Sequence, residues 1–155
     1  MASTQAIAVF ESIYRRTDQQ IRDILAAAEG VTEVDTINVL IGDGTNVLTP
    51  GVKAAVRVDF RARITGGFIH EFDGTTGSAL ISIAKAQYAV DAPPSFASIV
   101  GGTPLSVTDA RYSEDNDLVG WDQYLERGDV LRYTVSLATG FRRLLVCLRI
   151  RRLEP

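Results

Sequence analysis

The sequence predicts a mainly β protein: an antiparallel, jelly-roll-like β-sandwich preceded by one amphipathic N-terminal α-helix. Apolar residues occupy every second position from 52 to 64, which is the period of a strand with one buried face and one solvated face. The same alternation recurs in three other segments, 35–41, 130–137 and 144–151. The first thirty residues follow a helical period instead. We therefore expect a helix within residues 1–33 and a β-domain at 34–155.

The predicted helix carries a single apolar stripe. Its members are three and four residues apart, as at the a and d positions of a heptad repeat, and those expected to make contacts are Ile7, Phe10, Tyr14, Ile21 and Ile24. Nothing else in the first thirty residues can cover this stripe. We therefore expect residues 1–33 to anchor the chain on another protein or to hold three copies together. Packing on the chain's own sheet is the alternative that the sequence leaves open.

The first half of the β-domain consists of predicted strands separated by glycine-containing turns. The strands are expected at 35–41, 52–64, 68–72 and 79–86. The turn "GDGTN" at 42–46 contains Gly and Asn, which tolerate positive φ, and an Asp that can cap its own backbone. "TGG" at 65–67 is expected to break the long strand, and "DGTTG" at 73–77 forms another turn.

The second half begins with loops and ends with two strands. Prolines in "DAPPS" (91–95) and "GGTP" (101–104) exclude a helix there. The acidic stretch 109–117 is expected to be a solvated loop. The last two strands, 130–137 and 144–151, are joined by "ATG", so we expect them to form a C-terminal hairpin.

The composition narrows the class of protein. A chain of 155 residues with 46% hydrophobic content fits one domain with a real core. A net charge of −3 argues against a dedicated nucleic-acid-binding protein, which would usually be basic. The single Cys147 excludes an internal disulfide. We find no secretory signal and no apolar run of the roughly 18 residues that a membrane span needs, so no membrane partner is expected.

No motif in the sequence predicts catalysis. His70 lies next to Glu71, but adjacent strand residues point to opposite faces and cannot share a metal without help. Cys147 is on a predicted strand, and we interpret it as a buried structural thiol. "SEDND" at 113–117 lacks the glycine and the distal glutamate of a calcium-binding loop. We expect no enzymatic activity, no cofactor and no metal.

Three arginines are candidates for contacts with a partner. Arg57, Arg61 and Arg63 fall on the solvated face of the predicted strand 52–64. Such a row could hold phosphates or an acidic partner. Because the same chain carries the acidic stretch 109–117, ion pairs within the chain or between subunits are the simpler use.

Turn and core motifs of the β-domain form a recognisable series. A Gly-Asp-Gly turn comes first, followed by a long amphipathic strand, a Ser-led strand, a Pro-containing loop, a "GW" pair and a "GDVLR" turn into a strand. This series, over roughly residues 35 to 152, resembles a β-sandwich module of tailed-bacteriophage virion surface proteins of the tail-fibre and capsid-decoration type. The matching positions are Gly42, Asp43, Gly44, Gly77, Ser78, Lys85, Tyr88, Pro93, Gly120, Trp121, Gly128, Asp129, Leu131 and Arg132.

The resemblance implies a β-sandwich that assembles as a homotrimer on a phage particle. We therefore expect a non-enzymatic structural protein of the virion, made in the cytoplasm of the bacterial host, whose partners are other capsid or tail proteins. A trimeric capsid decoration (cement) protein or a short surface projection fits a sandwich behind one helix. Trp121 is expected to be structural and buried in the core.

The alternative is a receptor- or glycan-binding module at the tip of a tail fibre. Glycan sites normally need aromatic side chains on which a sugar can stack, so a host-surface glycan would require such groups in exposed loops. The aromatic residues that loops could present are Tyr88, Phe96, Tyr112 and Tyr124.

Overall fold

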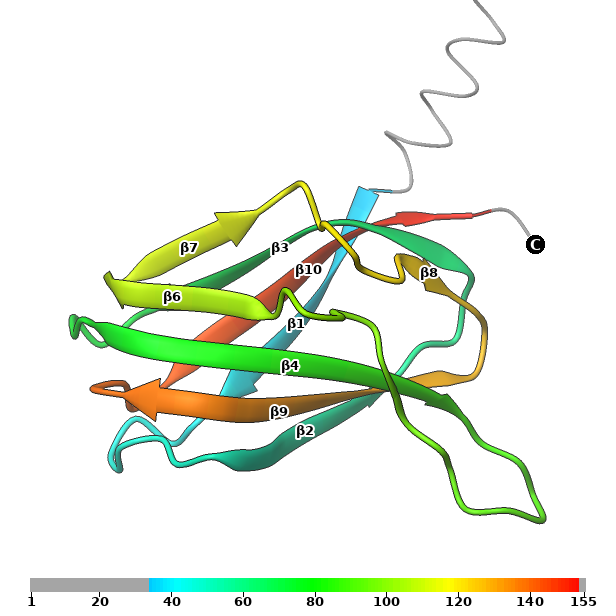
Figure 1. Ribbon diagram of the computed structural model, residues 1–155, viewed down its shortest axis with the longest axis horizontal. Coiled ribbons are helices and arrows are strands. Elements are labelled where there is room, and N and C mark those ends of the chain that lie inside the picture. Colours follow the sequence, from blue (N-terminus) through cyan, green and yellow to red (C-terminus); the bar gives the residue numbers. More distant parts are fainter. Residues whose placement is uncertain (1–33, 154–155) are drawn as a thin grey trace, which may run out of the picture.

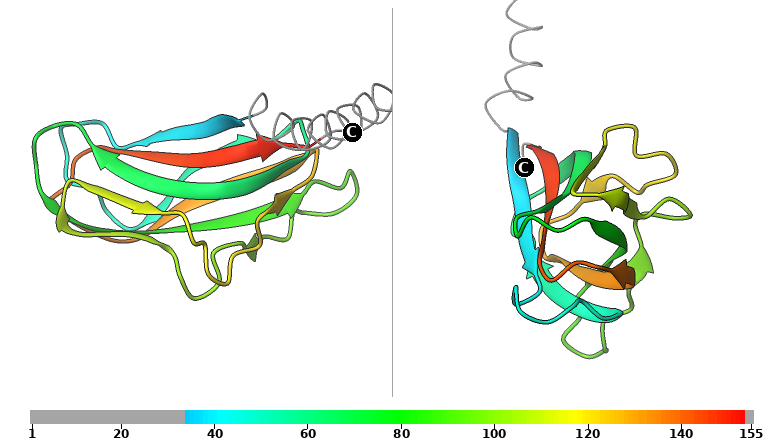
Figure 2. Two further views of the ribbon diagram at one scale, coloured as in Figure 1. Left: turned by 90° about the horizontal axis from the view of Figure 1, so that it is seen from above. Right: turned by 90° about the vertical axis from the view of Figure 1, so that its left-hand side faces the viewer.

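The computed structural model describes residues 34–153, which form two antiparallel sheets packed face to face (Figures 1 and 2). Sheet A has the strand order β1 (Val34–Ile41), β10 (Leu144–Arg152), β3 (Ala62–Glu71) and β7 (Tyr112–Asp115), with β8 (Tyr124–Leu125) also on β3. Sheet B has the order β2 (Gly51–Arg57), β9 (Asp129–Thr139), β4 (Gly77–Gln87) and β5 (Ala97–Ser98), with β6 (Leu105–Ala110) also on β4. The predicted antiparallel β-sandwich is confirmed. The helix predicted within residues 1–33 lies outside the described residues.

The chain repeatedly crosses from one sheet to the other. β1, β2, β3 and β4 alternate between sheets A and B, and the later strands return in the same manner to β9 in sheet B and β10 in sheet A. As a result β1 pairs with β10 and β2 pairs with β9, so the first two strands lie beside the last two. This double-sheet arrangement is the topology of a jelly roll.

The prediction of one long strand at 52–64 is wrong. β2 ends at Arg57 in sheet B and β3 begins at Ala62 in sheet A, and residues 58–61 cross between them. The apolar alternation continues through the crossing because Val58 is buried and Phe60 packs against the core. The Val58 N–H donates to the carbonyl of Asp129 (2.8 Å), and the Gly128 N–H donates to the carbonyl of Val58 (2.7 Å). The pattern therefore predicted the inward-facing residues from 54 to 64, although Val52 is 59% exposed and the chain changes sheets after Arg57.

The predicted break at 65–67 is also wrong, because these residues lie inside β3. The register against β10 shifts between Arg149 and Ile150, which accommodates one extra residue on β3. A Cβ on Gly67 would lie 2.9 Å from the Leu105 side chain of the other sheet, so this glycine permits close packing. Glycine at this place therefore reflects the contact between sheets and not a turn.

The last two strands do not form the predicted hairpin. β9 belongs to sheet B and β10 to sheet A, and residues 140–143 arch across the edge of the core between them. Phe141 is fully buried in this arch, and its carbonyl accepts the N–H of Leu48 at 2.8 Å. A buried aromatic side chain in the connection directs the chain over the core instead of back along the same sheet.

The acidic stretch is more ordered than the predicted loop. Residues 112–115 form β7, which pairs with β3 from Gly67 to His70. Residues 109 and 110 are the last two residues of β6. β5 and β8 have two residues each. Strands this short have no detectable period, so alternation could not predict them.

The core lies between the two inner faces and is built from aliphatic side chains around a few aromatic ones. Its largest fully buried members include Tyr133, Phe141, Ile41, Ile64, Ile69, Ile81, Ile83, Leu131, Leu144 and Leu148. Trp121 is 8% exposed and joins this core, and its indole N–H donates to the carbonyl of Thr103 at 2.8 Å. Both the ring and its polar atom are therefore accommodated by the fold.

Replacing Trp121 should destabilise the domain strongly. Trp121→Ala removes a buried aromatic side chain and leaves a cavity, which typically costs about 3–5 kcal/mol. The free energy of unfolding in urea should fall by that amount, with a smaller loss for Trp121→Phe, which keeps most of the apolar volume. Equal unfolding midpoints for Trp121→Ala and the parent would show that the ring has no structural role.

Candidate functional site

The outer face of sheet A carries a row of apolar and aromatic side chains. Leu40 of β1, Leu145 of β10, His70 of β3 and Tyr112 of β7 are direct cross-strand neighbours. They point away from the core, because the residues that alternate with them, such as Ile41, Leu144 and Ile69, are buried. Leu40 is 55% exposed and Tyr112 is 49% exposed. The row therefore reaches solvent across the whole width of the sheet.

Two phenylalanines extend the row into a patch. The ring centroids of Phe68 and Tyr112 are 6.2 Å apart, and His70 lies 5.4 Å from Phe72 and 5.8 Å from Tyr112. We call Leu40, Phe68, His70, Phe72, Tyr112 and Leu145 the aromatic patch. The solvated face of an antiparallel sheet is usually polar, and contiguous exposed apolar groups mark interaction surfaces. The aromatic patch is thus the part of sheet A best suited to contact another molecule.

Cys147 supports the patch from within the same face. It is opposite Asn38 on one side and Phe68 on the other, and only 1% of it is exposed. Burial raises the pKa of the Cys147 thiol, so the protonated form is favoured. A covered thiol that stays protonated serves packing and is unsuited to act as a nucleophile.

A polar cluster borders the patch on β7 and β10. Glu114 accepts a hydrogen bond from the Tyr112 hydroxyl (2.5 Å) and pairs with Arg149 (2.6 Å), which also donates to Asn116 (3.2 Å). The hydroxyl of Tyr112, followed by the guanidinium of Arg149, lowers the pKa of Glu114 to about 2. The same hydrogen bond raises the pKa of Tyr112, because the hydroxyl proton is held by a carboxylate. This cluster fixes the Tyr112 ring at the edge of the patch.

The structure does not gather the three predicted arginines on one surface. Arg57 pairs with Asp59 (2.9 Å) beyond the end of β2, and Arg61 pairs with Glu126 (3.2 Å) in the crossing at 58–61. Arg63 of β3 donates to Gln123 (3.1 Å), and its guanidinium lies 5.8 Å from the Tyr124 ring centroid. Each of the three arginines lines a different hollow. They are separated because the strand that was expected to carry them is two strands in two sheets.

The residues predicted to anchor the chain or to hold three copies together are all in the first thirty residues. Ile7, Phe10, Tyr14, Ile21 and Ile24 lie outside the described residues. The aromatic patch was not predicted, although Phe68, His70 and Phe72 alternate with Ile69 and Glu71 in the sequence. Two aromatic rings on the side opposite a buried isoleucine were the signal that could have revealed it.

The described residues offer little for catalysis. Within 34–153 no three His, Cys, Asp or Glu side chains come together as metal ligands. Glu71, fully buried, accepts the backbone N–H groups of Asp73, Gly74 and Thr75 and the Nε of Arg111 at 3.3 Å, so its oxygens are occupied. The same part of the chain contains no helix of sufficient length and apolarity to span a bilayer.

No protein-family model and no curated protein matches this sequence. Among solved structures, the chain is similar to one in the capsid of Ralstonia phage GP4, with 9% identity, a TM-score of 0.37, and coverage of 79% of this chain and 86% of that one. It is also similar to a chain of infectious bursal disease virus Gx strain, with 7% identity, a TM-score of 0.33, and coverage of 78% and 37% respectively.

Removing the Tyr112 hydroxyl should change the titration of Glu114. In Tyr112→Phe the pKa of Glu114 should rise from about 2 toward 4.5, its ordinary value, because the carboxylate loses its strongest hydrogen bond. The stabilisation from ionised Glu114 is present above pH 4.5 and is lost as the pH falls through about 2. In the variant this contribution should be smaller, because the folded-state pKa of Glu114 is closer to its ordinary value. Carboxyl carbon shifts followed by NMR report the midpoint. Tyr124→Phe is the control, and an unchanged midpoint in Tyr112→Phe would assign the shift to Arg149.

Proposed function

We propose that this chain is a non-enzymatic structural protein of a phage virion, a trimeric capsid decoration protein or a short surface projection. The observation that carries the proposal is the aromatic patch on the outer face of sheet A. A patch of exposed rings and leucines on a sheet with a complete core of its own calls for a protein surface to cover it. Binding to another copy or to another virion protein would supply that cover.

The free edge of sheet A supports an assembly role. β1 pairs with β10 in an unbroken register from Val34 to Ile41, and among residues 34–153 no second strand pairs with β1. Its sequence, VDTINVLI, contains neither lysine nor proline, the residues that usually protect an edge strand from pairing. In sheet B, by contrast, the edge strand β2 contains Lys53 and a register shift. Sheet A is thus the side of the sandwich with fewer barriers to association.

The sequence resemblance supports the choice of a virion. Its motif residues define the fold: a Cβ on Gly42, where φ is +98°, would lie 2.2 Å from the carbonyl oxygen of Arg142. Asp43 accepts the backbone N–H groups of Thr45 and Asn46, both at 2.8 Å, and these bonds lower the pKa of Asp43 to about 2. The Gly-Asp-Gly motif on which the resemblance partly rests therefore forms a tight turn in this jelly roll. Jelly rolls serve viral capsids and also lectins.

A charge placed in the patch should disrupt assembly. Light scattering on the full chain at micromolar concentration should give the mass of a trimer, and Leu40→Glu should shift that mass toward the monomer. Leu137→Glu is the matched control, because Leu137 lies on the outer face of sheet B and is exposed to a similar extent, 48% against 55%. Both variants should retain the β-sheet circular dichroism of the parent.

Two outcomes would contradict the proposal. A parent chain that is a stable monomer would remove the trimer, and equal masses for Leu40→Glu and the parent would remove the aromatic patch from the interface. If Leu137→Glu alone dissociated the oligomer, the interface would lie on sheet B.

A second candidate function is glycan binding at a tail-fibre tip, and one observation favours it. Tyr88 is 60% exposed beside a hollow of about 360 Å³ that is also lined by Arg57 and Gln87. An exposed ring with polar neighbours can stack on a sugar. The other aromatic residues offered for this role are less available: Arg132 lies 4.1 Å over the Phe96 ring, and Arg63 lies beside Tyr124.

Glycan binding would depend on Tyr88. If this function is correct, Tyr88→Ala should abolish binding to host-surface polysaccharide on a glycan array, because stacking contributes roughly 1–3 kcal/mol for comparable ring contacts. Val90→Ala, in the same exposed loop, should bind like the parent. Binding that persists in Tyr88→Ala, or no binding by the parent, would leave the structural role as the only candidate.

A further inference from the structure

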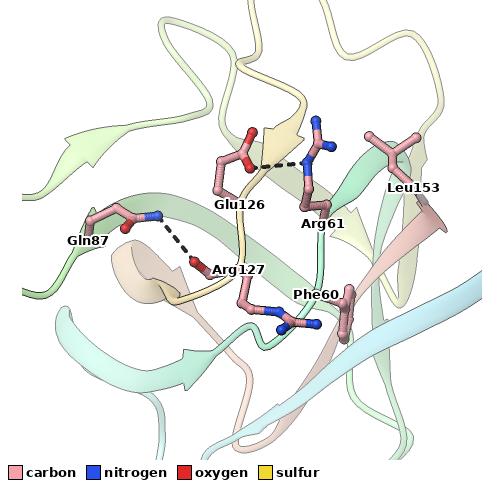
Figure 3. A pocket seen from close by; sticks show the side chains of 6 residues that line it. All are labelled: Phe60, Arg61, Gln87, Glu126, Arg127 and Leu153. Carbon is pink, nitrogen blue, oxygen red and sulfur yellow. Dashed lines mark hydrogen bonds and ion pairs between the residues drawn. The ribbon is translucent and has the colours of Figure 1, made fainter. Parts of the chain in front are cut away.

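A hollow of about 580 Å³ lies where residues 58–61 cross from sheet B to sheet A. It is lined by Phe60, Arg61, Gln87, Glu126, Arg127 and Leu153 (Figure 3). These side chains come from four separate segments: the crossing, the end of β4, the turn before β9 and the end of β10. Its volume falls within the range typical of small-ligand and peptide-side-chain sites.

A buried carboxylate holds one wall of the hollow in place. Asp129 is 3% exposed, accepts the backbone N–H of Glu126 at 2.7 Å, and accepts the side-chain amide of Gln87 at 2.8 Å. The same Gln87 amide reaches the carbonyl of Arg127 at 3.4 Å (Figure 3). The turn that carries Glu126 and Arg127 is therefore fixed to β4 and β9, and the hollow does not depend on a loose loop.

The opposite wall is apolar and equally fixed. The guanidinium of Arg152 lies 4.2 Å from the Phe60 ring centroid and is held by Asp35 at 2.8 Å. The backbone N–H of Leu153 donates to the carbonyl of Arg61 at 2.9 Å, which places the Leu153 side chain at the rim. An apolar group entering the hollow would contact Phe60 and Leu153.

The charged side chains that line the hollow are Arg61, Glu126 and Arg127. Glu126 is paired with Arg61, whereas Arg127 takes part in none of the ion pairs found among residues 34–153. Its side chain extends from the turn in the direction of Phe60 (Figure 3). A guanidinium can donate two parallel hydrogen bonds to one carboxylate, so Arg127 is matched to an acidic group.

We infer that this hollow binds an acidic peptide segment of a partner protein. A carboxylate of the segment contacts Arg127, and a neighbouring apolar side chain packs on Phe60 and Leu153. A free inorganic anion would contact only Arg127 and would make no apolar contact with Phe60 or Leu153. The inference goes beyond the assembly proposed above and does not depend on the oligomeric state, because the hollow is formed within one chain.

The test uses the full chain and a fluorescein-labelled peptide of sequence Glu-Glu-Leu-Glu-Phe-Glu, followed by fluorescence anisotropy. The parent should bind it saturably, and Arg127→Gln should weaken binding by about tenfold or more through loss of a charge-assisted hydrogen bond. Arg142→Gln is the matched control, since it removes the same charge from the arch at 140–143, at the other end of the sandwich. It should change the affinity by less than about twofold.

The remaining outcomes overturn the inference. They are no saturable binding by the parent at millimolar peptide, or an equal loss of affinity in Arg127→Gln and Arg142→Gln, which would indicate attraction by overall charge. A third is binding of a glucuronate oligosaccharide, but not of the peptide, in an Arg127-dependent manner, which would assign the hollow to an acidic glycan. Light scattering on the same samples separates these outcomes from a failure of assembly.

Discussion

The domain depends on one apolar layer shared by two sheets, because every connection must cross that layer or pass its edge without leaving backbone groups unpaired. At 58–61 the crossing is closed by hydrogen bonds from Val58 to Asp129 and from Gly128 to Val58. At 140–143 it is closed by the buried Phe141 and its bond to Leu48. The hollow beside Arg127 exists because one of these crossings bends around the core, so a candidate binding site follows directly from the topology.

The alternation of apolar residues predicted most inward-facing side chains, but it missed that Val52 and Leu137 are exposed, and it did not predict which strands pair. It located the strands that became β1, β9 and β10, because each has one buried face. It joined β2 to β3 and β9 to β10 incorrectly, since a period of two says which way a side chain points and not which sheet holds the strand. Gly66 and Gly67 looked like a break because the contact that requires Gly67, with Leu105, is distant in sequence.

The candidate sites were harder to predict for the same reason. Arg57, Arg61 and Arg63 are all at odd-numbered positions and were therefore expected on one face of a single strand. Because the chain changes sheets between them, each lines a different hollow. The aromatic patch combines residues from four strands, and only its β3 members are neighbours in sequence. The patch lies toward the end of sheet A where β10 begins, and the Arg127 hollow lies at the end where β10 finishes. The two proposed surfaces therefore lie at opposite ends of sheet A.

The pairing of β1 with β10 has a kinetic consequence. β10 lies between β1 and β3 in sheet A, and Val34 is opposite Arg151, so neighbouring strands of this sheet are separated by almost the whole domain in sequence. Contacts of such long range close slowly, because the chain loses much conformational entropy before they form. During synthesis β1 has no strand partner until β10, the last strand of the domain, has been made. In sheet B, β2 has the same delay because its partner is β9, whereas β4 can pair earlier with β5 and β6.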